Sequence, residues 1–129
     1  MVAFVAAMRE AWNTGDFETY MQYHENRPET LLIFDQNVYE GWDAVRALYK
    51  NIFDTGARKG EVSFSNERVF SLSENTATLT ANWCLQSLEG RQIGGIFTLA
   101  LRRNAEGWRI VVDHSATIPQ EQKVEVGLK

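Results

Sequence analysis

The sequence is poor in the residues that build disulfide frameworks and metal centres. It has one cysteine, Cys84, and two histidines, His24 and His114. A single cysteine excludes an intrachain disulfide, and these three residues have no spacing typical of metal ligands. Chains without structural disulfides are common in reducing compartments. We therefore expect a cytoplasmic protein without a metal site.

Basic patches and long apolar runs are also missing. The net charge is −4 and charges of both signs are mixed along the chain, so no surface for nucleic acid is expected. No apolar stretch approaches the ~20 residues of a membrane span. The apolar N-terminal run leads directly into Arg9 and Glu10, which argues against a secretory signal. No glycine-rich phosphate loop is present, and we expect no cofactor.

The remaining pattern predicts one α+β domain. Apolar residues at helical spacing predict helices over 4–12, 17–23 and 42–53, with Gly15 ending the first helix and Asp16 capping the second. Alternating residues predict six strands, at 31–34, 37–40, 61–72, 76–87, 92–103 and 108–117. Helices followed by antiparallel strands are typical of the α+β class. We expect the domain to cover 1–118 and a polar tail to cover 119–129.

Two turns predict which side chains share a face of the sheet. A tight turn at Glu89 and Gly90 would pair Asn82 with Phe97, and a turn at 104–107 would pair Phe97 with His114. The face under the helices should then hold Asn82, Phe97, Leu99, Val112 and His114. Asp113 should point to the opposite face, because neighbouring residues of a strand alternate.

The opposite, convex face would then be apolar. Its predicted members are Leu79, Trp83, Leu85, Ile96 and Val111. The helices cannot cover both faces, and a large exposed apolar surface usually marks an interface. A second copy of the chain is the simplest cover, so we expect a homodimer through this face.

Three segments resemble a known family. WNTGD (12–16), GWDAV (41–45) and GIFTLALRRNAEGWRIVVDHS (95–115) are similar, in order and spacing, to the nuclear transport factor 2-like superfamily, especially its SnoaL-like and ketosteroid-isomerase-like members. The resemblance implies a cone in which helices cover a strongly bent, mainly antiparallel sheet and leave a deep pocket. It also implies dimers through the convex face. Members include isomerases, cyclases, dehydratases and non-catalytic binding or assembly domains, so both classes stay open.

The resemblance can be carried to individual site residues. Asp35 in IFDQ (33–36) matches the position of the ketosteroid isomerase base. Met8 and Leu99 match the two positions that donate hydrogen bonds to the oxyanion, and neither side chain can donate one. The standard isomerase machinery is therefore not expected.

The sequence leads to one main hypothesis and one alternative. We expect a pocket for a small apolar, carbonyl-bearing ligand, with His114 and Asp35 as acid/base groups and Asn82 as an orienting group. Such an enzyme would be of the isomerase, cyclase or lyase type. The alternative is a non-catalytic binding or assembly module, in which His114 is a half-buried structural histidine and Asp35 a turn residue. The expected ligand-binding residues are Asn82, Phe97, Leu99, Val112, Tyr20, Trp42 and Tyr49.

Overall fold

The elements follow the predicted α+β order. The computed structural model describes residues 1–55, 60–87 and 90–119. Most of the predicted tail, residues 120–129, lies outside this range. The elements are α1 (Val2–Thr14), α2 (Phe17–Gln22), β1 (Leu31–Phe34), β2 (Asn37–Glu40), α3 (Trp42–Thr55), β3 (Glu61–Ser71), β4 (Thr76–Gln86), β5 (Gln92–Asn104) and β6 (Gly107–Ile118).

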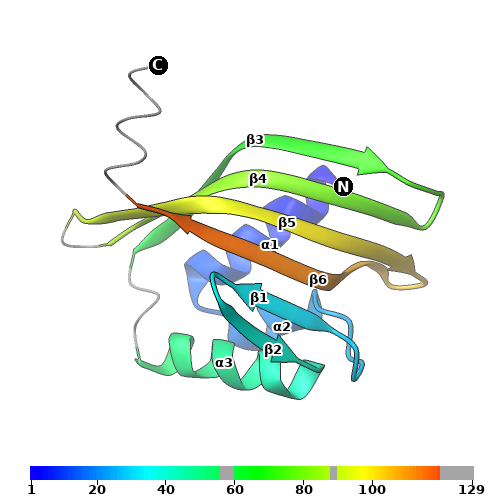
Figure 1. Cartoon of the computed structure of the whole chain (residues 1–129), viewed down its shortest axis with the longest axis horizontal. Coiled ribbons are helices and arrows are strands. Elements are labelled where there is room, and N and C mark those ends of the chain that lie inside the picture. The colour runs from blue at the N-terminus through cyan, green and yellow to red at the C-terminus, as the bar shows by residue number, and fades with distance from the viewer. Residues whose placement is uncertain (56–59, 88–89, 120–129) are drawn as a thin grey trace.

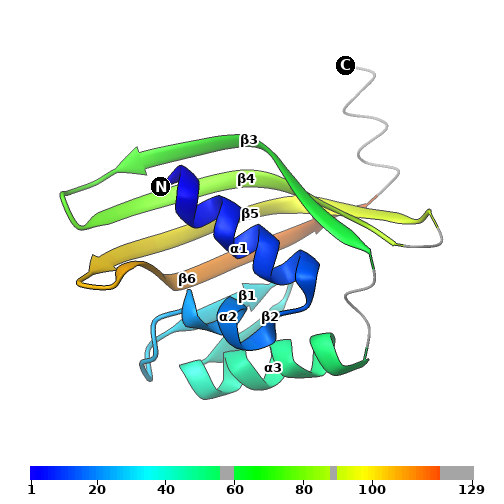
Figure 2. The ribbon, with the colours of Figure 1, turned by 180° about the vertical axis from the view of Figure 1, so that it is seen from behind.

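The strands form one mixed sheet with all three helices on one side. The strand order is β2-β1-β6-β5-β4-β3, and every neighbouring pair is antiparallel except β1 and β6. Figure 1 faces the open side of the sheet, and Figure 2 shows α1 lying across the other side. The expected fold, helices packed on a bent and mainly antiparallel sheet, is confirmed.

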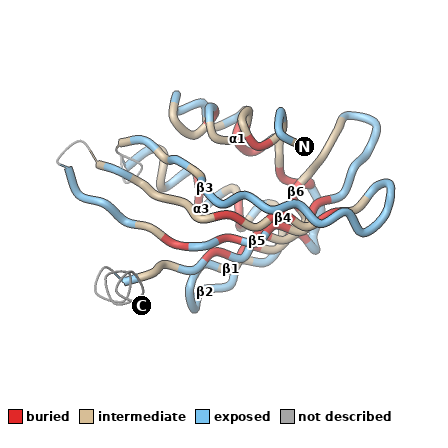
Figure 3. Tube along the Cα trace, turned by 90° about the horizontal axis from the view of Figure 1, so that it is seen from above, coloured by how far each residue is buried: buried red, intermediate tan, exposed pale blue. Residues whose placement is uncertain are grey.

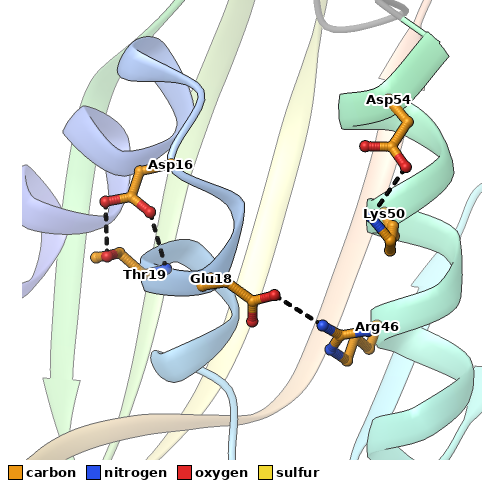
Figure 4. A network of polar contacts seen from close by, with 6 residues as sticks. All are labelled: Asp16, Glu18, Thr19, Arg46, Lys50 and Asp54. Carbon is orange, nitrogen blue, oxygen red and sulfur yellow. Dashed lines mark hydrogen bonds and ion pairs between the residues drawn. The ribbon is translucent and has the colours of Figure 1, made fainter.

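The first helix ends and the second begins at the residues that the sequence predicts, Gly15 and Asp16. Gly15 ends α1 in the left-handed conformation with φ 76°, which glycine adopts without a steric cost. Asp16 caps α2, because its carboxylate accepts from the backbone N–H of Thr19 at 3.3 Å and from its hydroxyl at 2.7 Å. Arg46 of α3 donates a hydrogen bond to Glu18 of α2 over 2.8 Å (Figure 4), and this bond links the two helices.

The connection between β4 and β5 is longer than the predicted tight turn. Gln86 pairs with Gln92, so residues 87–91 join the strands. Of the two predicted turn residues, Glu89 lies outside the described range. The longer connection moves the register by one residue, and Asn82 pairs with Ile96 instead of Phe97. Because side chains alternate, this shift exchanges the two faces of β4.

A β-bulge in β6 exchanges the faces a second time. The turn at 104–107 forms as predicted, and Leu101 pairs with Ile110. The next pair along β5 is Ala100 with Val112, so Val111 is an extra residue on β6. Beyond the bulge Leu99 pairs with Asp113, which is buried, whereas His114 is exposed. The predicted orientation of the Asp113–His114 pair is therefore wrong.

The core lies between the helices and the sheet, as the buried segments in Figure 3 indicate. Leu79 is fully buried on this side, and Trp83 packs against the same core. Both were predicted on the convex face, and that prediction is wrong because the register between β4 and β5 differs by one residue from the predicted one. Of the predicted convex residues, Ile96 does point away from the helices, with 46% of its surface exposed.

Candidate functional site

A cavity of about 380 Å³ lies between the helices and the inner face of the sheet. Helix α1 contributes Met8 and Trp12, and the long strands contribute their inward-facing residues. Nearly all lining side chains are apolar or aromatic, as is typical of small-molecule pockets. The lining residues are Met8, Trp12, Tyr20, Leu32, Phe34, Tyr39, Leu48, Tyr49, Ile52, Val62, Phe64, Trp83, Leu85, Ile93, Phe97, Leu99, Asp113 and Ser115.

Asp113 is the only carboxylate among the described residues that line this cavity. The β6 bulge turns it inward, and only 7% of the residue is exposed. Ser115 donates its hydroxyl to Oδ1 over 2.9 Å, and Tyr49 donates to Oδ2 through a long bond of 3.4 Å. Each carboxylate oxygen thus has one hydroxyl partner, so the group is oriented in an apolar surrounding.

Burial sets the protonation behaviour of Asp113. Desolvation raises its pKa from 3.8 to about 6, because the charged form is disfavoured away from water. The hydrogen bonds from Ser115 and Tyr49 and the charge of His114 oppose this rise. A carboxyl group with a pKa near neutrality can both accept and release a proton under ordinary conditions.

Two tyrosines stand beside this carboxyl group. Tyr20 and Tyr49 pack edge to face with ring centroids 5.0 Å apart. Burial, followed by nearby charge that includes Asp113, raises the pKa of both hydroxyls above the ordinary value of 10.0. Both therefore keep their protons at neutral pH and serve as hydrogen-bond donors.

Two further donors in the cavity wall have no acceptor in the part of the chain that the structure describes. The indole Nε1 atoms of Trp12 and Trp83 are buried and form no hydrogen bond among the described residues. Both residues line the cavity, one from α1 and one from β4. Unpaired buried donors are uncommon in native proteins and call for an explanation.

His24 lies just behind the cavity wall. It is 4% exposed, and its ring packs against Tyr20 and Tyr49 at centroid distances of 5.3 and 5.6 Å. Nδ1 lies 3.2 Å from the carbonyl oxygen of Tyr20, so this nitrogen carries the proton. Burial lowers the pKa of His24 to about 4, and the ring is neutral at pH 7. It also borders a second, polar cleft of about 460 Å³.

The structure brings four of the predicted ligand-binding residues into the cavity: Tyr20, Tyr49, Phe97 and Leu99. Trp42 lines the polar cleft instead, and Val112 pairs with Ala100 on the face away from the helices. Asn82 is also on the outer face, where its Oδ1 accepts from Asn66 at 3.4 Å. The β4–β5 connection and the β6 bulge explain the misplacement of Asn82, Val112 and His114.

Asp35 is a turn residue. It connects β1 to β2 with a left-handed backbone, φ 54°, which aspartate tolerates better than most residues. Its carboxylate accepts from the Thr117 backbone N–H at 2.8 Å and from the Thr117 hydroxyl at 3.1 Å. The residue is exposed and does not line the cavity, so the predicted placement of Asp35 in the pocket is wrong.

The sequence did carry a signal for some of the missed residues. In β4 the odd positions are Ala77, Leu79, Ala81 and Trp83, whereas the even ones are mostly threonine or asparagine. This alternation by itself places Trp83 on the buried side. Asp113 had no such signal, because its orientation depends on the bulge.

The described residues contain neither a cluster of metal ligands nor a membrane-spanning helix. No group of three or more His, Cys, Asp or Glu side chains lies together as a metal site within residues 1–55, 60–87 and 90–119. Over the same part of the chain, no helix has the length and apolar character needed to cross a bilayer.

Comparisons with solved structures find the same fold. An NTF-2 like protein of unknown function from Shewanella oneidensis is 33% identical, with a TM-score of 0.80 over 89% of this chain and 94% of that one. A putative dehydratase of the NTF2-like family from Streptomyces avermitilis is 22% identical, with a TM-score of 0.74 and coverages of 91% and 92%. A putative calcium/calmodulin dependent protein kinase II association domain from Xanthomonas campestris is 17% identical, with a TM-score of 0.71 and coverages of 92% and 86%.

Comparison with curated proteins gives no match. Residues 2–120, in contrast, match the SnoaL-like domain family over nearly the whole chain. Together with the resemblance to the Shewanella protein, this match shows that the chain belongs to the SnoaL-like domain family, within the NTF2-like superfamily.

Proposed function

We propose that the cavity binds a small apolar molecule that carries a carbonyl group, and that Asp113 is the acid/base residue acting on it. The observation that carries this proposal is a buried carboxyl group, held by two hydroxyls, in a cavity whose other walls are nearly all apolar. Perturbed titratable groups in apolar clefts are typical of functional sites.

The supported chemistry is proton transfer at carbon. The Asp113 carboxylate would take a proton from the carbon next to the carbonyl, forming an enol or enolate, and return it at the same or a conjugated carbon. The atoms balance without an external oxidant or reductant. A pKa of about 6 suits both steps near neutral pH. Asp113 thus takes the role that the sequence suggested for His114 and Asp35.

The standard ketosteroid isomerase mechanism is not part of this proposal. Met8 and Leu99 line the cavity at the two matched donor positions, and neither can donate a hydrogen bond to an oxyanion. We expect no turnover of a 3-oxo-Δ5 steroid at the rate of an efficient isomerase. Such turnover in a steady-state absorbance assay would show that another donor replaces them.

The test uses 2-tetralone, a bicyclic ketone with acidic hydrogens next to its carbonyl. Proton NMR in D₂O follows the loss of these hydrogens with and without the protein. We expect the wild type to accelerate the exchange above the buffer rate. Asp113→Asn, which keeps the shape of the side chain, should reduce the protein-dependent rate by about 100-fold or more.

His114→Ala is the matched control, because His114 is the neighbour of Asp113 on the exposed face. Because the charge of His114 lowers the pKa of Asp113, the comparison is made well above that pKa, where the carboxyl group is ionised in both proteins and His114→Ala should retain the exchange rate. Equal loss in both variants would contradict the assignment of Asp113. Binding of 2-tetralone without any exchange would favour the alternative, a non-catalytic binding module of the same fold.

We also propose that the chain forms a homodimer through the sheet face opposite the helices. Phe70 and Ile96 point outward there and are 53% and 46% exposed. Exposed apolar residues on this sheet face support association with a second copy. Light scattering should give the dimer mass for the wild type and the monomer mass for Ile96→Glu. Glu40→Gln, an exposed change on the sheet edge strand β2, is the control.

A further inference from the structure

We infer that Trp12 and Trp83 are specificity residues whose indole N–H groups donate hydrogen bonds to two acceptor oxygens of an uncharged ligand. This inference rests on the proposed function, because it concerns the molecule bound in the same cavity. It adds the class of that molecule: a neutral, largely apolar compound with an acceptor oxygen at each of two separate positions.

Trp12 supplies the first donor from the helical layer. Its ring is surrounded by aromatic rings, with centroids 5.4 Å from Tyr20, 6.3 Å from Tyr49 and 5.2 Å from Phe53. These rings pack around the indole at the cavity wall, and a ring face accepts an N–H only weakly. Nε1 is buried and has no hydrogen-bond acceptor among the described residues.

Trp83 supplies the second donor from the sheet. Its indole lies against Gly95 of β5, where an added Cβ would be only 2.8 Å from the ring atoms Cε2 and Cζ2. Phe34 packs on the same ring with centroids 6.4 Å apart. Nε1 of Trp83 is likewise buried without an acceptor among the described residues. The two donors therefore belong to opposite layers of the cavity wall.

A ligand that supplies acceptor oxygens to the two indole N–H groups is energetically favoured. Leaving a buried donor unpaired costs about 1–3 kcal/mol. The chain has two more tryptophans, Trp42 and Trp108, and neither has a buried unpaired N–H or lines this cavity. Both unpaired indoles thus belong to the one cavity proposed to bind a ligand. A carbonyl or ether oxygen is the acceptor group of an apolar molecule with the smallest free-energy cost of removal from water.

The charge of the site further restricts the class of ligand that can bind. Among the described residues that line the cavity, Asp113 is the only carboxylate and there is no lysine or arginine. An anionic ligand would meet a buried like charge with no cation among these described residues to balance it, which is strongly unfavourable. We therefore expect neutral ketones, diketones or quinone-like rings to bind, and carboxylates of the same skeleton to be rejected.

Both N–H groups are covered by neighbouring atoms. A ligand oxygen reaches them only after a side chain or the indole itself shifts. The experiment therefore observes the N–H groups directly. In an ¹⁵N–¹H spectrum each of the four tryptophans gives one indole signal, and Trp→Phe variants assign the signals.

Decalin-1,5-dione is the probe, and decalin is the matched hydrocarbon without oxygen. We expect the diketone to shift the Trp12 and Trp83 N–H signals downfield, as new hydrogen bonds do, and decalin to leave their N–H protons close to their original positions. Trp42 and Trp108 are internal controls and should stay unchanged with both compounds. A naphthoate should shift none of the four.

Affinity gives a second readout. Trp12→Phe and Trp83→Phe keep an aromatic ring but remove the donor, so each should weaken diketone binding about 3- to 10-fold, the range of one hydrogen bond. Each should leave decalin binding within twofold of the wild type.

The outcomes separate the two proposals. If the diketone binds in the cavity but shifts neither indole signal, or if both variants weaken diketone and decalin equally, the inference is wrong and an internal water or an aromatic face satisfies the donors. If neither compound binds, the proposed function itself fails. If only one of the two indole signals shifts, the inference that the ligand carries an acceptor oxygen at each of two positions is wrong.

Discussion

The Ser115 hydroxyl donates to Oδ1 of Asp113 over 2.9 Å, and the two residues are separated by only one position on β6. Both side chains point to the helices because they follow the bulge at Val111. Ser115 thus positions the carboxyl group from its own strand, while Tyr49 of α3 donates to the other oxygen from across the cavity.

Removal of this hydroxyl should raise the pKa of Asp113. The Ser115 bond stabilises the charged carboxylate and opposes the rise caused by burial. In Ser115→Ala the pKa should therefore lie above the wild-type value of about 6, as measured by NMR titration of the carboxyl carbon. The 2-tetralone exchange profile should move to higher pH by the same amount. Ser63→Ala, an exposed serine on β3, should leave both unchanged. An unchanged profile in Ser115→Ala would remove Ser115 from the site.

His24 and Asp113 should give opposite contributions to stability between about pH 4 and 6. The folded-state pKa of His24 is lowered from 6.5 to about 4, so its contribution to folding is lost as pH falls through this window. The folded-state pKa of Asp113 is raised from 3.8 to about 6, so its contribution is greatest below 3.8 and is lost as pH rises through 6.

Urea unfolding at several pH values separates these two contributions. Relative to the wild type, His24→Phe should gain stability as pH falls from 6.5 to about 4. Asp113→Asn should lose relative stability as pH falls from about 6 to 3.8. Each variant serves as the control for the other, because both replace a buried group in the same region and only the sign of the pH dependence should differ. Slopes of equal sign would contradict the burial of one of them.

A side chain at Gly95 should damage both the sheet and the cavity wall. A Cβ there would lie 2.0 Å from the carbonyl oxygen of Ala116 and 2.8 Å from two atoms of the Trp83 indole. Gly95→Ala should therefore lower the free energy of unfolding by about 1–3 kcal/mol through overpacking. Thermal unfolding measures the loss, and tryptophan fluorescence reports the displaced indole. Thr98→Ala, at an exposed position of β5, should change neither. A wild-type melting temperature in Gly95→Ala would contradict the close approach of β5 and β6.

Asp35 should matter for stability and not for chemistry in the cavity. Its carboxylate accepts two hydrogen bonds from Thr117 and so fastens the β1–β2 turn to the end of β6. Asp35→Ala should lower the free energy of unfolding by about 1–2 kcal/mol, measured in urea, because these partly exposed bonds are lost. Its 2-tetralone exchange rate should equal that of the wild type under native conditions. A stable protein without exchange activity would restore Asp35 as the base.

Local sequence chemistry was enough to predict the elements. Gly15 ends α1 and Asp16 caps α2 through interactions that span only a few residues. The change from helical to alternating spacing places the strands, and segments 31–34 and 37–40 have the predicted bounds. The resemblance to the SnoaL-like family predicted that helices cover one face of the sheet, because the order of the similar segments follows the order of elements in that fold.

The composition of the site depended on two register details. The alternation of residues along β4 carries a signal for the first, whereas no local pattern encodes the second. The connection at 87–91 moves β4 by one residue against β5, and the extra residue Val111 moves the end of β6. Side chains alternate along a strand, so each one-residue step exchanges the inner and outer faces. The sequence by itself determined that an aspartate and a histidine are neighbours in β6. Only the tertiary structure decided that Asp113 enters the cavity and His114 meets solvent, because a bulge forms where packing of the whole sheet against the helices favours it.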